Sequence, residues 1–289
     1  MNRKREKPGL TLIEILTVIA IIALLIGILI PAVTAVKDAA KEVKQRGQFM
    51  TIELGLTAFK NDYGDYPQSY YGHNPPLILV RGGGIYCGSQ KMTEALLGWD
   101  LLGFHPDSDW CWDGLAAYDP GLRPATFDER KKPYLESGTQ YAFKLGDLFG
   151  SALPTPKGAN TYLLCDVFGA TRVGRADGSS VNAGAPILYY KADPSGKFND
   201  PSLVDTSRPW DNGGNIYNCL DNLTIVSMKE AKDGASVPKF SDYATFYDYI
   251  RDPKITAKPT PYNPSSYILI SAGKDGTYGT PDDIRNFGD

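Results

Sequence analysis

A single acidic residue, Glu14, lies near the start of a long apolar run. Between Leu10 and Val36 it is the only charged residue. A carboxylate inside a lipid bilayer costs roughly 2.5 to 3.5 kcal/mol by insertion measurements. Glu14 is therefore either an acid that reaches the membrane surface and has no role, or an acid that pairs with a positive charge.

A second acidic group, Asp275, Asp282 and Asp283, lies close to the C-terminus. Three glycines at intervals of three residues let this segment curl tightly, so the carboxylates could converge with backbone carbonyls on a hard cation. Calcium takes six to eight oxygen ligands in a flexible cage, but the spacing is not that of an EF-hand. On residue chemistry alone, an Asx turn in contact with solvent is the better interpretation.

The cysteines leave two interpretations open. They allow up to two disulfides in three pairings, or they are free thiols in a core. They contain no C-x-x-C pair, which argues against zinc. The four are Cys87, Cys111, Cys165 and Cys219.

Catalysis finds little support in the sequence. His73 and His105 are the only histidines, and neither adjoins a nucleophile motif. The glycines at 82 to 84 lack the lysine and serine of a phosphate-binding loop. We therefore expect a protein that is not an enzyme.

The apolar run is long enough to cross a membrane. Roughly 20 apolar residues at about 1.5 Å each span a bilayer core of about 30 Å. The first nine residues carry a charge of +3, which places the N-terminus in the cytoplasm and the remaining chain outside. The rest of the chain is mildly acidic and has no basic stripe, so no nucleic acid is expected as a partner.

The start of the run resembles the N-terminal motif of type IV pilins and type II secretion pseudopilins. In that superfamily a short basic leader ends in glycine and is followed by an apolar residue and Thr-Leu-Ile-Glu. Here Gly9 precedes Leu10, and the Thr-Leu-Ile-Glu sequence ends at Glu14. The resemblance implies that a prepilin peptidase cuts between Gly9 and Leu10, with N-methylation of Leu10, which stands where Phe is usual.

Such a cut would give Glu14 a partner. It leaves a free α-amine at Leu10, one helical turn away, and opposite charges in a medium of low dielectric attract strongly. The partner of Glu14 could be the amine of the same chain or that of a neighbouring chain. The resemblance implies the neighbour, whose contact would set the axial register of a filament.

A helix is expected from Leu10 to about Phe59, where Asn61, Gly64 and Pro67 stop it. Pro31 lies inside it and removes one hydrogen bond. We expect a kink or a short unwound stretch between Gly27 and Pro31, or else only the end of the membrane segment there.

Beyond Pro31 the helix is expected to be amphipathic, with two apolar stripes. The apolar pattern spans too few heptads for a coiled coil, so we expect a helix that lies on its own globular domain. The first stripe consists of Val33, Val36, Ala40, Val43, Gly47, Met50 and Leu54, and the second of Phe49, Ile52, Leu56 and Phe59.

Two further segments resemble the major pseudopilins of type II secretion. The end of the helix, with its Asp-x-Gly-x-Tyr-Pro sequence, is similar to their junction between helix and body. The C-terminal segment is similar to their calcium-binding loop, which implies Ca²⁺ as a cofactor. The matching positions of that loop are Ser271, Gly273, Asp275, Gly276, Asp283 and Ile284.

The expected fold class is α+β, with the long N-terminal helix packed on a small antiparallel sheet and with large loop insertions at 68–88 and 103–160. Short helices are expected from Ser89, as N-cap, and from Ser241. Runs rich in β-branched and aromatic residues predict strands at 161–169, 186–193 and 266–273.

We therefore expect a structural subunit of a type II secretion pseudopilus, anchored in the inner membrane by one span. Its expected partners are prepilin peptidase, further copies of itself, other pseudopilins and the inner-membrane assembly platform. A surface pilus subunit and a membrane-tethered binding protein that does not polymerise are the alternatives. The expected domains are a leader at 1–9, a transmembrane and filament-core helix at 10–33, an amphipathic helix at 34–60, and an extracytoplasmic domain at 61–289 with an acidic loop at 271–285.

Overall fold

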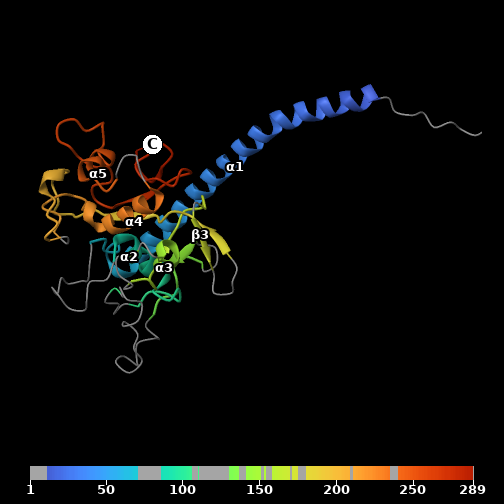
Figure 1. Cartoon of the computed structure of the whole chain (residues 1–289). Helices are drawn as coiled ribbons and strands as arrows, with labels where there is room; N and C mark the ends of the chain where they lie inside the picture. Colours follow the sequence, from blue (N-terminus) through green and yellow to red (C-terminus); the bar gives the residue numbers. More distant parts are fainter. Residues whose placement is uncertain are drawn as a thin grey trace, which may run out of the picture. The chain divides into compact units, whose positions relative to one another are not determined.

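The computed structural model describes residues 12–70, 86–105, 110, 130–136, 141–150, 153, 158–169, 171–174, 180–208, 211–234 and 240–288. The chain divides into two compact units, Met1–Val43 and Lys44–Asp289. Its longest element, α1 (Leu12–Tyr63), contributes to both units (Figure 1). The expected α+β class is confirmed, since the second unit combines short helices with small antiparallel sheets.

The part of α1 from Leu12 to Ile30 is apolar apart from Glu14, and it is exposed. Its large hydrophobic side chains between Leu12 and Ile30 are 48 to 83% exposed. Within the described residues, α1 is the one helix whose length and composition suit a membrane span. A helix that is apolar on every side needs lipid or other apolar helices around it.

α1 is helical without interruption through Pro31, so the unwound stretch predicted between Gly27 and Pro31 is wrong. Proline removes only the one helical hydrogen bond that would reach the Gly27 carbonyl. Thr34 adds a bond from its Oγ1 to the Ile30 carbonyl at 3.1 Å. The loss of one bond does not unwind a helix whose neighbouring turns are intact.

In the second unit, α1 packs on the body through the second of its two predicted stripes. Phe49, Ile52, Leu56 and Phe59 are at most 4% exposed. At about 100° per residue, the two stripes lie on roughly opposite faces of the helix. The first stripe therefore points away from this contact, and its Leu54 is 71% exposed.

Gly55 lies on the packing face and allows the body to come close. A Cβ at this position would lie 3.1 Å from the Cδ2 atoms of both Leu96 and Leu135. The helix then ends at Tyr63, later than the expected end near Phe59. Gly64 follows with φ of +85°, a conformation that glycine adopts without strain.

Seven short strands form three antiparallel sheets in the described residues. The three predicted strands are confirmed at shorter lengths as β2, β5 and β6, and the sequence pattern did not indicate the other four. The central sheet has the order β5-β6-β7, with Tyr189 opposite Leu269 and Ser271 opposite Ile284. The strands are β1 (Ala142–Lys144), β2 (Tyr162–Leu164), β3 (Thr171–Gly174), β4 (Ser180–Ala183), β5 (Leu188–Lys191), β6 (Tyr267–Ser271) and β7 (Ile284–Arg285).

The second unit also contains short helices (Figure 1). The two predicted ones are present, α2 and α5, and the sequence pattern did not indicate the others. The α-helices are α2 (Gly88–Leu97), α3 (Leu145–Phe149), α4 (Leu223–Asp233) and α5 (Tyr243–Tyr249), and the 3-10 helices are η3 (Pro201–Leu203) and η4 (Cys219–Asp221).

The N-cap of α2 is Cys87, so the predicted N-cap Ser89 is wrong. The Gln90 side chain reaches back and its Oε1 accepts a hydrogen bond from the Cys87 N–H at 2.7 Å. The Ser89 hydroxyl donates instead to Oδ1 of Asn222 at 2.8 Å. The Ser89 hydroxyl therefore makes a tertiary hydrogen bond instead of capping the helix.

One part of the core of the second unit forms where α1 and α2 meet the central sheet, and a larger buried cluster joins that sheet to α3, α4 and α5. All ten residues of α2 are buried, including Lys91 and Glu94. One buried apolar cluster joins α1, α2 and the sheet through Phe49, Ile52, Leu56, Met92, Leu96, Tyr189 and Leu269. This contact fixes the last four turns of α1 to the body.

Candidate functional site: the apolar helix and the acidic C-terminal loop

The apolar part of α1 carries the predicted assembly residues Glu14 and Pro31. Glu14 lies in the first turn of α1 with its side chain exposed, and Thr17 donates from Oγ1 to the Glu14 carbonyl at 2.9 Å. An acid in a first helical turn is favoured by the partial positive charge of that end. Gly9 and Leu10, the predicted cleavage and methylation positions, lie outside the described residues.

The loop between β6 and β7 is closed by its own carboxylates. Oδ2 of Asp282 accepts from the N–H groups of Lys274 and Asp275 at 2.7 and 2.9 Å, and Oδ1 accepts from the Thr280 hydroxyl at 2.7 Å. Oδ1 of Asp275 accepts from the Thr277 N–H at 2.7 Å. The Asp275 contact is that of an Asx turn, whereas Asp282 joins the two ends of the loop by accepting from N–H groups seven and eight residues earlier.

Asp283 differs from Asp282 in its surroundings. Its Oδ2 accepts from the Tyr249 hydroxyl at 2.5 Å and from the Gly279 N–H at 2.7 Å. Burial raises the pKa of Asp283 to about 7, although these hydrogen bonds oppose the rise. Burial also acts to raise the pKa of Asp282, but hydrogen bonds from Thr280 and from backbone N–H groups outweigh it, so that pKa is lowered.

The arrangement of these carboxylates does not favour the predicted calcium site. In the part of the chain that the structure describes, no group of three or more His, Cys, Asp or Glu side chains could hold a metal ion. Asp275, Asp282 and Asp283 direct oxygens to donors of the loop and to the Tyr249 hydroxyl instead of forming a cage of six to eight oxygens. Calcium binding stays a prediction from the sequence.

Three of the four cysteines are buried free thiols, namely Cys87, Cys165 and Cys219. No disulfide joins these three, and Cys111 lies outside the described residues. Burial raises the pKa of both Cys87 and Cys219 to about 12. Neither is therefore a reactive thiolate at neutral pH, and both act as small core residues.

Comparison with known proteins agrees with the resemblance at the N-terminus. Residues 4–30 match the family described as the prokaryotic N-terminal methylation motif. Over 70 residues the chain is 33% identical to the type II secretion system core protein G of Pseudomonas aeruginosa and 30% identical to that of Aeromonas hydrophila. Each alignment covers 24% of this chain and 49% of the relative, so the chain spans about half the length of the curated relatives it matches. No solved structure matches the chain.

The match to the methylation motif includes the position of Glu14 and most of the apolar part of α1. A long N-terminal helix followed by an α+β body is the architecture that the resemblance implies. The chain therefore carries the prokaryotic N-terminal methylation motif, and over 70 residues it is similar to the type II secretion core protein G of two bacteria.

Proposed function

We propose that the chain is a structural subunit of a type II secretion pseudopilus, cut by prepilin peptidase after Gly9 and polymerised through its N-terminal helix. The observation that carries this proposal is the methylation motif at residues 4–30, joined to a helix that is apolar and exposed from Leu12 to Ile30. Such a surface is stable in lipid before assembly and against other apolar helices after it.

The charge of the leader supports one orientation. Four basic residues against Glu6 precede the apolar run, which favours a cytoplasmic N-terminus and an extracytoplasmic body. Repeated contacts between unlike surfaces that do not close into a ring generate a filament. Growth of that filament would push exported proteins outward, with other pseudopilins and the inner-membrane assembly platform as partners.

Glu14 has a specific role in this proposal. After cleavage, its carboxylate pairs with the N-terminal amine of Leu10 in a neighbouring subunit. Both charges lie in an apolar medium, so each lowers the other's cost of burial. Loss of the carboxylate should impair assembly and leave membrane insertion and cleavage largely intact.

Cysteine crosslinking in cells tests the proposal. Single cysteines are introduced in turn at positions 15 to 26 of α1, in a Cys111→Ser background, and crosslinked by an oxidant. Because Cys87, Cys165 and Cys219 are buried, they should not contribute. A ladder of multimers on a denaturing gel supports polymerisation, and monomer alone at every position contradicts it.

Two variants examine Glu14 in the same assay. Glu14→Gln should be cleaved normally and lose the ladder. Thr17→Val is the matched control, because it removes a polar group from the same apolar run without changing its charge, and it should keep the ladder. A normal ladder from Glu14→Gln would contradict the role given to Glu14. A cleaved chain that never forms multimers would favour the membrane-tethered binding protein.

A further inference from the structure

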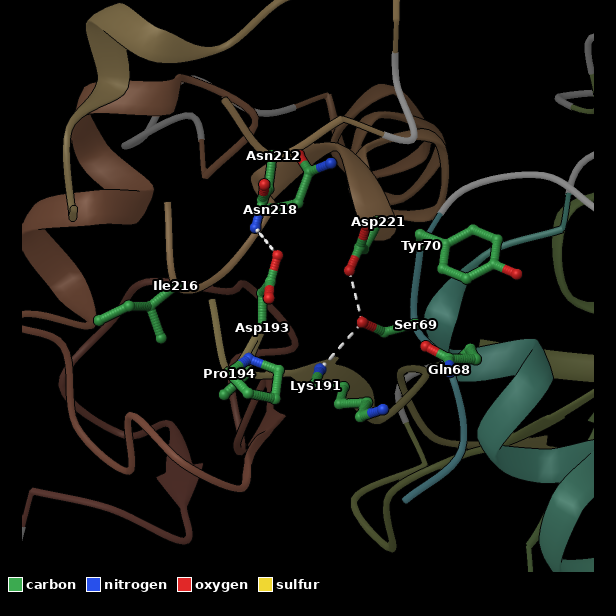
Figure 2. Close-up of a pocket in the computed structure, with 11 residues that line it drawn as sticks. Gln68, Ser69, Tyr70, Lys191, Asp193, Pro194, Asn212, Ile216, Asn218 and Asp221 are labelled. Carbon is green, nitrogen blue, oxygen red and sulfur yellow. Dashed lines mark hydrogen bonds between the residues drawn. The ribbon is translucent and has the colours of Figure 1, made fainter. Parts of the chain in front are cut away.

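The second unit contains a polar cavity that the filament function does not use. Its volume is about 310 Å³, near the lower end of the roughly 300 to 1,000 Å³ typical of small-molecule sites. Its walls come from the segment after α1, the end of β5, and the residues between η3 and α4. Figure 2 shows Asp193 and Pro194 across the opening from Ser69 and Asp221.

One wall of the cavity is a carboxylate held by a hydroxyl. Ser69 donates from Oγ to Oδ2 of Asp221 at 2.5 Å, and the same Oγ accepts from the Lys191 N–H at 2.9 Å (Figure 2). The Asp221 residue is only 2% exposed. Its carboxylate is therefore fixed in orientation before any ligand arrives.

The opposite wall is fixed in the same way. Oδ1 of Asp193 accepts from the N–H and the hydroxyl of Ser195, both at 2.8 Å, and Oδ2 accepts from Nδ2 of Asn212 at 2.7 Å. Asn218 completes this side, and its Oδ1 accepts from the Leu220 N–H at 3.0 Å. Carboxylates and carboxamides thus face the cavity from both sides.

The charges around the cavity disfavour an anionic ligand. Lys191 lines the cavity, but its Nζ pairs with Oδ2 of Asp65 at 2.5 Å. The ammonium of Lys91 is buried behind Tyr70, where it donates to the Tyr70 carbonyl at 2.6 Å and lies 3.8 Å from the ring centroid. Among the described residues, a phosphate would therefore meet two carboxylates, while the ammonium groups of Lys191 and Lys91 are directed to other partners.

A cationic ligand would gain little either. Asp193 already accepts three hydrogen bonds, which leaves about one lone pair of its carboxylate for a ligand donor. Burial lowers the pKa of Lys91 to about 7 and the charge of Asp221 opposes this, so the two groups interact. Both carboxylates are thus held by neutral donors of the protein, and the same kind of donor, a neutral hydroxyl group, is the ligand partner that this wall suits.

We propose that this cavity binds a neutral polyhydroxylated ligand, a saccharide unit. The Asp193 carboxylate can accept from a hydroxyl, while the carboxamides of Gln68, Asn212 and Asn218 both donate and accept, as the vicinal hydroxyls of a sugar also do. Pro194 and Ile216 add apolar surface for the C–H groups of a sugar ring. Walls that are already ordered keep the entropic cost of binding low.

Saturation-transfer difference NMR on the full chain in lipid nanodiscs tests this site. Nanodiscs avoid detergents whose sugar headgroups would compete. The neutral probes are maltotriose, cellotriose and triacetylchitotriose, the anionic probe is glucose 6-phosphate, and the cationic probe is lysine amide. Saturable transfer to at least one neutral trisaccharide is expected, with weaker or no transfer to the two charged probes.

Variants locate the binding in the cavity. Asn212→Ala removes a polar wall and should weaken binding at least tenfold. Gln68→Trp fills the mouth and leaves the hydrogen bonds of both walls in place, so it should abolish transfer even if Asn212→Ala proves unstable. Leu102→Trp, an equal gain in bulk at a position that is 67% exposed and does not line the cavity, should bind as the parent chain does. Absence of transfer to every neutral trisaccharide, undiminished transfer in Gln68→Trp, or tighter binding of a charged probe would overturn the proposal.

Discussion

Replacing Leu56 by alanine should destabilise the second unit far more than the same change at Leu54. Leu56 is fully buried, in the cluster that joins α1 to α2 and the central sheet, whereas Leu54 is 71% exposed. The two leucines are two positions apart on one helix, so helix propensity changes equally in both variants. The difference between them measures packing alone.

The magnitude follows from the packing around Leu56. Leucine to alanine removes three carbon atoms, about 2.4 kcal/mol at about 0.8 kcal/mol for each CH₂. A cavity term adds to this, because the buried cluster around Leu56 relaxes only partly into the space that the side chain leaves. We expect a loss of about 3 to 4 kcal/mol for Leu56→Ala, and less than about 0.5 kcal/mol for Leu54→Ala.

Denaturant unfolding of the full chain in detergent micelles, followed by tryptophan fluorescence, measures this difference. Equal losses in the two variants, or a larger loss for Leu54→Ala, would show that the second stripe is not the packing face. The crosslinking assay adds a functional comparison. Leu54→Ala should weaken the ladder although its body is folded, because the exposed stripe is then the surface left for a neighbouring subunit.

Three further predictions concern charged groups. The folded-state pKa of Lys91, about 7, lies below its ordinary value of 10.5, so folding disfavours the ammonium. The unfolding free energy should therefore rise by about 1.5 kcal/mol from pH 7 to 8.5. Denaturant titrations at the two pH values measure this rise, which should be absent in Lys91→Met. Asp282→Ala removes three hydrogen bonds of the C-terminal loop, so amide exchange at Lys274 and Asp275 should accelerate with a stability loss of about 1 to 2 kcal/mol. Calorimetry of the full chain with calcium tests the loop: saturable heat that disappears in Asp275→Ala would support the calcium site predicted from the sequence and show that the loop rearranges around the ion, and no saturable heat would contradict it.

Local patterns were enough to predict several elements of the body. The runs around Tyr162, Leu188 and Tyr267 are rich in aromatic and β-branched residues, and each contains a strand. The segment of α5 has aromatic residues at helical spacing, and Asp242 caps it through the Thr245 N–H at 3.0 Å. In these places the same side chains that set the local preference also fill the core.

Elsewhere, contacts distant in sequence decided the outcome. Ser89 has the chemistry of an N-cap, but Asn222 lies 133 positions away and takes its hydroxyl. The polar cavity joins Ser69 to Asp221, which are 152 positions apart. No periodicity within either segment reports such a contact, so the cavity residues could be found only in the folded structure.

The two stripes of α1 show a different kind of limit. Both were visible in the sequence, and the pattern did not say which one would pack on the body. The structure selects the stripe of Phe49, Ile52, Leu56 and Phe59, in which Gly55 permits close approach. An apolar stripe that stays exposed on the opposite face of the helix lowers solubility unless another apolar surface covers it. On the proposed function the cover is another subunit, so the apparent redundancy of two stripes reflects one contact within the chain and one between chains.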